Sequence, residues 1–388
     1  MMRRGDWVEK SGYRWRVWRL WGTRPAVPSE RPRVGILTPY GLRRGLSTLT
    51  RNIEWALNGR AQVFPVRKLG RVDASFERVR AYRADRELAH PLVVPRGTRL
   101  VRWLAELDVW IGVERASPRV CAHCRAAGVR SIVVALPDWL PADPAVRARE
   151  LAQADVCAVY GEATARLLAG DGLANVVSLP LALDAPLAAA RPTGAEVVVY
   201  FNVGVGGPVD RRQVRLVLET FRTLLPRHPS LHLLVKVHPD ARRSLGPIEP
   251  FHSRMRAIDR ELSNAEMRAL LAEVDVTLFP SRFEGVGYPV LESLHAGVPV
   301  IATDAPPMNE IVAHERNGLL VRANDAGHYG AQTIRDVAPD DLRAQIERCA
   351  TDRALLDRLK AGATAGRAEA ADAFRRAWQE LVGIPRAD

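Results

Sequence analysis

The chain has 388 residues and 47% of them are hydrophobic, which excludes an intrinsically disordered protein because enough apolar surface can be buried to offset the entropy of ordering. At about 100 to 200 residues per domain, this length predicts two domains. No stretch approaches the roughly 20 apolar residues of a membrane span, and arginines interrupt the N-terminus where a signal peptide has its apolar core. We therefore expect a cytoplasmic protein.

The charge is positive and unevenly distributed. Fifty-six basic residues face 44 acidic ones, giving a net charge of +12, and all but four of the basic residues are arginines. Residues 1–100 carry +14, whereas the remaining 288 residues sum to −2. This field predicts an anionic partner for the N-terminal part, either a membrane surface or an acidic acceptor. A solvated arginine-rich face explains the same charges equally well.

Residues 1–30 form a basic extension in which Trp7, Trp15, Trp18 and Trp21 are interleaved with arginines. Tryptophan and arginine together suit a membrane interface or a nucleic-acid surface. The simpler alternative is an element that docks its tryptophans on the protein's own core. No helix-turn-helix, zinc-finger or RNA-binding motif supports the nucleic-acid alternative.

The four cysteines are too few for a disulfide framework. Cys121 and Cys124 form one CxxC pair around His123, but a structural zinc site needs four ligands and Cys157 and Cys349 offer no second pair. We interpret the pair as helix residues that pack one turn apart, and we expect no metal there.

From residue 33 onward, short β-branched runs alternate with amphipathic stretches. This alternation predicts βα units on a parallel sheet, in a first domain over residues 31–185. We expect a helix at 46–57 and strands at 33–38, 61–66, 107–113, 131–136, 155–160 and 176–179.

A second alternating series follows a Pro/Ala-rich segment that we interpret as a linker at 186–195. Ser263 and Glu266 have the spacing of a capping box at the start of one helix, and the pattern is helical from Pro339 onward. Two α/β domains joined this way enclose a cleft at the carboxyl ends of both sheets, where open α/β folds bind ligands. The strands of this second domain, residues 196–366, are expected at 196–202, 231–237, 274–279 and 298–303.

The most informative segment is FPSRFEGVGYPVLESLHAGVPVIATD, residues 279–304. Its strand leads into a glycine-containing loop and then a helix, which Pro289 can open and Gly297 can close. Backbone N–H groups at a helix N-terminus form an anion site, and glycines let a pyrophosphate approach closely. The residues predicted to supply these groups are Gly285, Val286, Gly287 and Tyr288.

Two carboxylates flank that predicted anion site. Glu292, just inside the helix, has two acceptor oxygens that can span the vicinal hydroxyls of a ribose, and Glu284 can bind sugar hydroxyls at the other end of the same ligand. Because carboxylates repel a pyrophosphate, cations are required nearby. Candidates on neighbouring loops are Arg211, Arg212 and Lys236, with Gly206 in the glycine loop before the arginines.

The segment PSRFEGVGYPVLESLHAGVPVIATD, with its Glu-x7-Glu pair and the later NEIV and NGLLV, resembles the retaining nucleotide-sugar glycosyltransferases of the GT-B architecture, the family 4 group. The resemblance implies two Rossmann-like domains facing across a cleft, with a C-terminal helix over 367–388 crossing back to the first domain. It also implies a nucleotide-diphosphate sugar as donor and no cofactor.

In a looser form the resemblance covers most of the chain. Gly45 is similar to the family's first glycine loop, near acceptor and pyrophosphate, and Arg212 falls at the family's phosphate-binding lysine. Two positions depart from the pattern. Gly207 replaces the usual arginine, and Asp138 lies in the region where the family often has a histidine, which makes Asp138 a candidate acceptor-side residue.

The resemblance implies transfer of a sugar to an acceptor hydroxyl with the anomeric configuration kept, with Glu284 and Arg212 as the expected catalytic residues. Basic side chains and a helix N-terminus would stabilise the departing diphosphate. The sequence has no Asp-x-Asp motif, and the candidate cations can take a metal's place, so no metal is expected.

The acceptor stays open, with an anionic or membrane-associated molecule at the inner membrane surface favoured by the charge. The alternatives are a non-catalytic nucleotide-sugar-binding protein and a basic module that binds a membrane or nucleic-acid surface.

Overall fold

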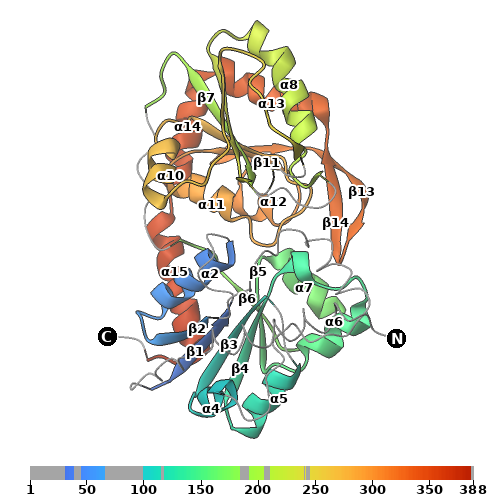
Figure 1. The fold of residues 1–388 in the computed structure, drawn as a ribbon, viewed down its shortest axis with the longest axis vertical. Helices are drawn as coiled ribbons and strands as arrows, with labels where there is room; N and C mark the ends of the chain where they lie inside the picture. Colours follow the sequence, from blue (N-terminus) through green and yellow to red (C-terminus); the bar gives the residue numbers. More distant parts are fainter. Residues whose placement is uncertain are drawn as a thin grey trace, which may run out of the picture.

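A computed structural model describes two α/β bodies, one above the other in Figure 1. The predicted extension, residues 1–30, and most of the predicted linker lie outside the described residues. The structure describes residues 31–38, 45–65, 99–114, 118–183, 192–204, 210–239, 241 and 245–385.

The N-terminal body is a six-stranded parallel sheet in the order β2-β1-β3-β4-β5-β6. Its β-branched runs are buried because helices cover the sheet, which confirms the predicted βα units. The strands are β1 Val34–Thr38, β2 Ala61–Pro65, β3 Val109–Glu114, β4 Arg130–Ala135, β5 Val156–Tyr160 and β6 Val176–Leu179. The helices are α2 Gly45–Ala56, α4 Arg99–Ala105, α5 Pro118–Ala126, the 3₁₀ turn η2 Pro137–Trp139, α6 Pro144–Leu151 and α7 Glu162–Gly170.

The C-terminal body repeats this architecture with the strand order β12-β11-β10-β7-β8-β9, again all parallel. The predicted capping box is present, since Ser263 Oγ accepts from Glu266 N and the Glu266 carboxylate accepts from Ser263 N. The strands are β7 Val197–Gly204, β8 Leu231–Val237, β9 Met255–Ile258, β10 Val276–Phe279, β11 Val300–Thr303 and β12 Gly318–Val321. The helices are α8 Val214–Arg227, α10 Asn264–Leu271, α11 Tyr288–His295, α12 Met308–Ile311, α13 Pro339–Thr351, α14 Arg353–Thr364 and α15 Arg367–Val382.

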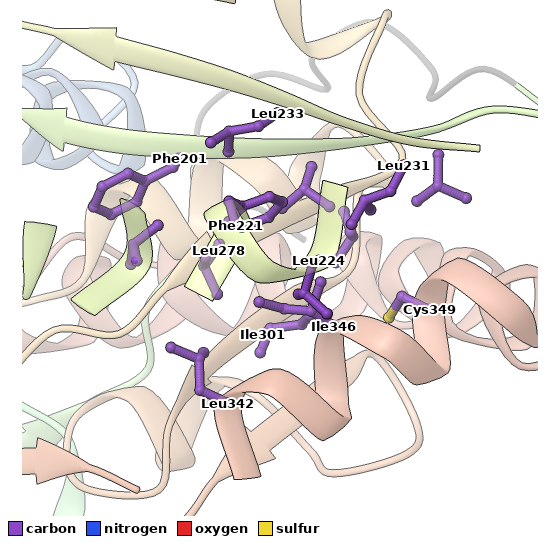
Figure 2. Close-up of a cluster of buried hydrophobic side chains, with 14 of the residues drawn as sticks. Phe201, Phe221, Leu224, Leu231, Leu233, Leu278, Ile301, Leu342, Ile346 and Cys349 are labelled. Atoms are coloured by element: carbon purple, nitrogen blue, oxygen red, sulfur yellow. The ribbon is translucent and has the colours of Figure 1, made fainter. Parts of the chain in front are cut away.

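The core of the C-terminal body forms where its sheet meets α8 and α13. Phe201 and Leu278 come from adjacent strands, Phe221 from α8 and Ile346 from α13, and all four are buried (Figure 2). Because both faces of the sheet are covered, its strands are continuous apolar runs rather than alternating ones. This rigid core holds the loops at the carboxyl end of the sheet.

One supersecondary element was not predicted. The segment after β12 folds into an antiparallel hairpin of β13 Ala323–Tyr329 and β14 Gln332–Val337, which extends from the C-terminal body toward the N-terminal body at the right of Figure 1. Most of β13 is exposed, so its sequence lacks the apolar alternation that marks a half-buried strand. The strands β9 and β12 were not predicted either.

The last helix, α15, crosses from the C-terminal body to the N-terminal one, as the resemblance implied (Figure 1). Phe374 and Trp378 are fully buried in the N-terminal core, and the Phe374 ring stacks on Trp55 of α2 with 6.0 Å between centroids. Gln379 Nε2 donates to Ala56 O at 2.9 Å. This helix therefore joins the two bodies covalently and by packing.

All four cysteines are buried free thiols. Cys121 and Cys124 lie on α5 in an apolar cluster, where burial raises their thiol pKa values to about 11 and about 12. They are core residues, as interpreted from the sequence. Among the described helices, none has the length and apolar character needed to cross a bilayer.

We predict that Trp378→Ala destabilises the protein by about 3 to 5 kcal/mol, because it removes a fully buried indole and leaves a cavity where α15 meets the N-terminal sheet. Urea unfolding followed by circular dichroism measures the change. Arg376→Ala is the control, since Arg376 is an exposed residue of the same helix. Equal stability of the two variants would contradict this account of the crossing.

Candidate functional site

The candidate site lies at the carboxyl end of the C-terminal sheet. Arg211 and Arg212 lie between β7 and α8, and residues 281–287 lie between β10 and α11. Asp138, in η2 after β4, reaches this place from the N-terminal body. The fold therefore brings together loops that follow strands in both domains, as expected for open α/β sheets.

Glu284 is the centre of a buried ionic cluster and is only 4% exposed. Arg211 donates to its carboxylate through Nε at 3.1 Å and Nη2 at 2.5 Å. Arg212 Nη1 donates to Oε1, and Ser281 Oγ donates to the same oxygen at 2.6 Å. The carboxylate is thus satisfied by three side chains, which is how a charge is retained in a protein interior.

The pKa values follow from this arrangement. Burial by itself raises the pKa of Glu284, but attraction to Arg211 and Arg212 and the hydrogen bonds from Arg211 and Ser281 outweigh it, so the pKa falls below its ordinary value. Burial and the neighbouring Arg211 lower the pKa of Arg212 to about 10, despite Glu284. At neutral pH Glu284 is therefore an ionised carboxylate held between two guanidinium groups.

Aromatic rings and backbone carbonyls support the two arginines. The Arg212 guanidinium lies 4.2 Å from the Phe279 ring centroid, and that of Arg211 lies 5.0 Å from Phe283. Arg211 Nε also donates to Phe283 O at 3.0 Å, and Gln213 Nε2 donates to Pro280 O at 2.9 Å. These contacts fix the arginine loop to the loop after β10.

The α11 N-terminus forms as predicted, with Gly287 in the left-handed region at φ +78°, Pro289 in the first turn and Gly297 after the end at φ +77°. No side chain caps this terminus. Val286 and Tyr288 are buried in the N-terminal core, and burial raises the pKa of Tyr288 well above its ordinary value. The loop is thus packed against the opposite domain rather than being open along its whole length.

Gly285 marks the closest approach between the domains at this site. A Cβ atom built on Gly285 would lie 2.4 Å from Asp138 Oδ1, so only glycine fits without displacement of that carboxylate. Asp138 Oδ2 lies 3.8 Å from Arg211 Nη1, a charge pair across the interface. Asp138 therefore contacts both the loop after β10 and the arginine that follows β7.

Glu292 and Lys236 form a second group on the same edge. Burial raises the pKa of Glu292 to about 7, although Arg51 and Lys236 oppose the shift. Burial lowers the pKa of Lys236, against the attraction of Glu292 and Glu261. The three predicted cations therefore act on different carboxylates. The two arginines bind Glu284, whereas the charge of Lys236 acts on the pKa of Glu292.

Two residues of the site were missed by sequence reasoning. Arg51, on α2, adds a cation near Glu292 from the N-terminal domain, and its position six residues after Gly45 was the available signal. Tyr200 is buried on β7, where burial and the charge of Glu292 raise the pKa of its hydroxyl and the charge of Arg212 opposes the rise. Tyr200 carries no signal in the sequence beyond a core strand.

Two predicted residues are placed less fully. Gly45 is the first residue of α2, on the side of the N-terminal domain that also carries Arg51. Gly206 lies outside the described residues, so its predicted contact with the donor stays a prediction.

We predict that Glu292 makes the protein less stable as pH rises. The folded state holds this proton up to about pH 7 whereas an unfolded glutamate loses it near 4.5, so the free energy of unfolding falls between these values and levels off above pH 7. Relative to wild type, Glu292→Gln should gain about 2 kcal/mol in unfolding free energy between pH 5 and pH 8. Urea titrations at both values test this, with the exposed Glu273→Gln as control. A constant difference between Glu292→Gln and wild type would refute the raised pKa.

Comparisons with known proteins agree with this architecture. Residues 197–338 match the family "Glycosyl transferases group 1". Glycogen synthase of Mycobacterium tuberculosis strain H37Rv is 28% identical over 184 residues, and the lipopolysaccharide core biosynthesis mannosyltransferase LpsB of Rhizobium meliloti is 29% identical over 136. These matches cover 46% and 32% of this chain, and 43% and 37% of the relatives. The chain is therefore matched to less than half the length of each.

The similarity in structure extends further. The crystal structure of Anabaena Alr3699/HepE in complex with UDP and glucose superposes with a TM-score of 0.61 at 14% sequence identity, covering 90% of this chain and 98% of that one. At this identity the comparison concerns the fold. It includes both sheets and the cleft between them, whereas the family match is confined to the C-terminal half. The chain has the GT-B fold, and its residues 197–338 match the glycosyl transferases group 1 family.

Proposed function

We propose that this protein is a retaining glycosyltransferase that moves a sugar from a nucleotide-diphosphate sugar to an acceptor hydroxyl. The observation that carries the proposal is the cluster of Glu284, Arg211 and Arg212 beside the uncapped N-terminus of α11, at the interface of the two domains. The group 1 domain supports it, as does the fold shared with a protein crystallised with UDP-glucose.

In this proposal the C-terminal domain binds the donor. The α11 N-terminus presents backbone N–H groups and the positive end of the helix dipole to the pyrophosphate. Glu292, one turn into the same helix, accepts hydrogen bonds from the ribose hydroxyls in its ionised form. The charge of Lys236 favours that ionised form, since it opposes the effect of burial on the pKa of Glu292.

The leaving group is stabilised by the arginines. As the glycosidic bond breaks, negative charge grows on the diphosphate, and preorganised cations in a water-poor site favour that transition state. Arg212 and Arg211 are preorganised because Glu284, Phe279 and Phe283 hold them in place. Because these two guanidinium groups can supply cations to the leaving group, we propose that the reaction proceeds without a metal ion.

Glu284 then has two roles. It orients both arginines, and its position in a loop at the domain interface supports a contact with the sugar of the donor. The acceptor enters from the N-terminal domain. The excess of basic residues in the first 100 positions supports an anionic or membrane-associated acceptor.

A second candidate is a nucleotide-sugar-binding protein without transferase activity. Asp138 favours it, because a carboxylate 3.8 Å from Arg211 competes with a diphosphate for the same cation. This alternative predicts donor binding without turnover, and the following two experiments separate the candidates.

The first prediction concerns the nucleotide. In a panel of UDP, GDP, dTDP, ADP and CMP, one nucleoside diphosphate should raise the melting temperature, since a ligand at about 100 times its dissociation constant adds about 2.7 kcal/mol. Glu292→Ala should weaken that nucleotide at least tenfold, because each lost charge-assisted hydrogen bond costs about 1.5 to 3 kcal/mol. Glu273→Ala, which removes an exposed carboxylate, is the matched control. Unchanged affinity in Glu292→Ala would overturn the ribose assignment.

The second prediction concerns transfer. With the identified donor, Glu284→Gln should reduce turnover about 100-fold, equivalent to about 2.7 kcal/mol of barrier, because it removes the carboxylate that orients both arginines. Proton NMR of the product should show the donor's anomeric configuration, and EDTA should leave the rate unchanged. Binding without turnover in wild type would favour the second candidate, and an inverted product would exclude the retaining mechanism.

A further inference from the structure

The β13–β14 hairpin bridges the two domains beside the candidate site. Its tip, residues 329–332, contacts the N-terminal domain, because Ala331 N donates to Leu140 O at 3.1 Å and Ala331 packs against the apolar cluster around α5. A Cβ atom on Gly330 would lie 2.5 Å from the same Leu140 oxygen. Contact this close leaves no room for a side chain at residue 330.

The same tip contacts the loop that carries Glu284. Gln332 Nε2 donates to Glu284 O at 2.6 Å, and the Tyr329 ring stacks on Phe283 with centroids 4.7 Å apart. Phe283 in turn supports the Arg211 guanidinium. The hairpin tip therefore contacts Glu284, which pairs with both arginines, and Phe283, whose ring lies against the Arg211 guanidinium.

The base of the hairpin is fixed to the C-terminal domain. Arg335 N donates to Arg282 O at 3.0 Å, and Arg282 Nε lies 2.6 Å from Asp336 Oδ1. Val337 N donates to Gln213 Oε1 at 3.3 Å. Because the base is held and the tip spans to Leu140, the hairpin can transmit the position of the N-terminal domain to the Glu284 loop.

Leu140 directly follows η2, which carries Asp138. The same segment of the N-terminal domain therefore meets the Glu284 loop at Gly285, through Asp138, and the hairpin tip at Gly330, through Leu140. The spacing between that segment and the Glu284 loop is therefore linked to the hairpin tip, which contacts both.

We propose that the β13–β14 hairpin is an interdomain strut, and that Gly330 and Gln332 are positioning residues that hold the Glu284–Arg211 pair at the working distance from the N-terminal domain. The strut acts on alignment between donor and acceptor rather than on nucleotide binding. Its effect on catalysis rests on the glycosyltransferase function proposed above.

The test uses two glycines of the same hairpin. Gly330 and Gly327 both have positive φ, +58° and +100°, so alanine strains the backbone at either position. A Cβ atom on Gly327 meets nothing within 4 Å, whereas on Gly330 it meets Leu140 O. Gly327→Ala therefore controls for backbone strain, and only Gly330→Ala pushes the domains apart.

In full-length protein, hydrogen exchange of the Ala331 amide should be at least tenfold faster in Gly330→Ala than in Gly327→Ala. With the identified donor, Gly330→Ala should lower kcat at least tenfold with the donor KM within threefold of wild type, while Gly327→Ala retains both. Gln332→Ala should also lower kcat, and Thr333→Ala, the neighbouring truncation, should not. The strut is wrong if Gly330→Ala retains wild-type kcat, or if Gly327→Ala loses as much.

Failure of the proposed function has a separate signature, since the wild type would then show no transfer with any nucleotide sugar. The exchange comparison still tests the strut in that case. Faster exchange confined to Gly330→Ala supports an interdomain strut in a protein of another function, and equal exchange in both glycine variants overturns it.

Discussion

The buried pairing of Glu284 with Arg211 and Arg212 is the interaction on which the site depends. A carboxylate that is only 4% exposed requires compensating charge, and two arginines of the loop after β7 supply it. The pairing ties the arginine loop to the loop after β10, so the two strand ends act as one unit. It also places two guanidinium groups beside a helix N-terminus, and both the guanidinium charges and the free backbone N–H groups of the helix favour a bound anion.

The relation between the domains is set by a few contacts at glycines. Gly285 admits the Asp138 carboxylate and Gly330 admits the Leu140 carbonyl. On α12, Glu310 Oε1 accepts from Ala163 N at 2.7 Å, and a Cβ on Gly161 would lie 2.1 Å from the other Glu310 oxygen. Small residues at these places let backbones and carboxylates of the two domains approach, whereas larger residues would hold the cleft open.

The α15 helix and the hairpin hold the domains in different ways. The helix inserts Phe374 and Trp378 into the N-terminal core, which buries large apolar surface and resists separation. The hairpin contributes a hydrogen bond and a close carbonyl contact at its tip, which fix spacing more than they add stability. Stable attachment and local alignment are thus supplied by separate elements.

The sequence by itself determined the βα alternation, the two sheets, the capping box at Ser263, the start of α11 at Gly287 and Pro289, and the candidacy of Glu284 and Glu292. These are local patterns of apolar periodicity, glycine, proline and capping residues, and they are legible within a few turns of chain. Tertiary structure decided what the charges do. Three pairings depend on segments distant in sequence. Both arginines bind Glu284, the charges of Arg51 and Lys236 act on the pKa of Glu292, and the β13–β14 hairpin contacts Leu140. Such pairings leave no periodic trace, because their energy comes from burial and from neighbours that only the folded chain brings together.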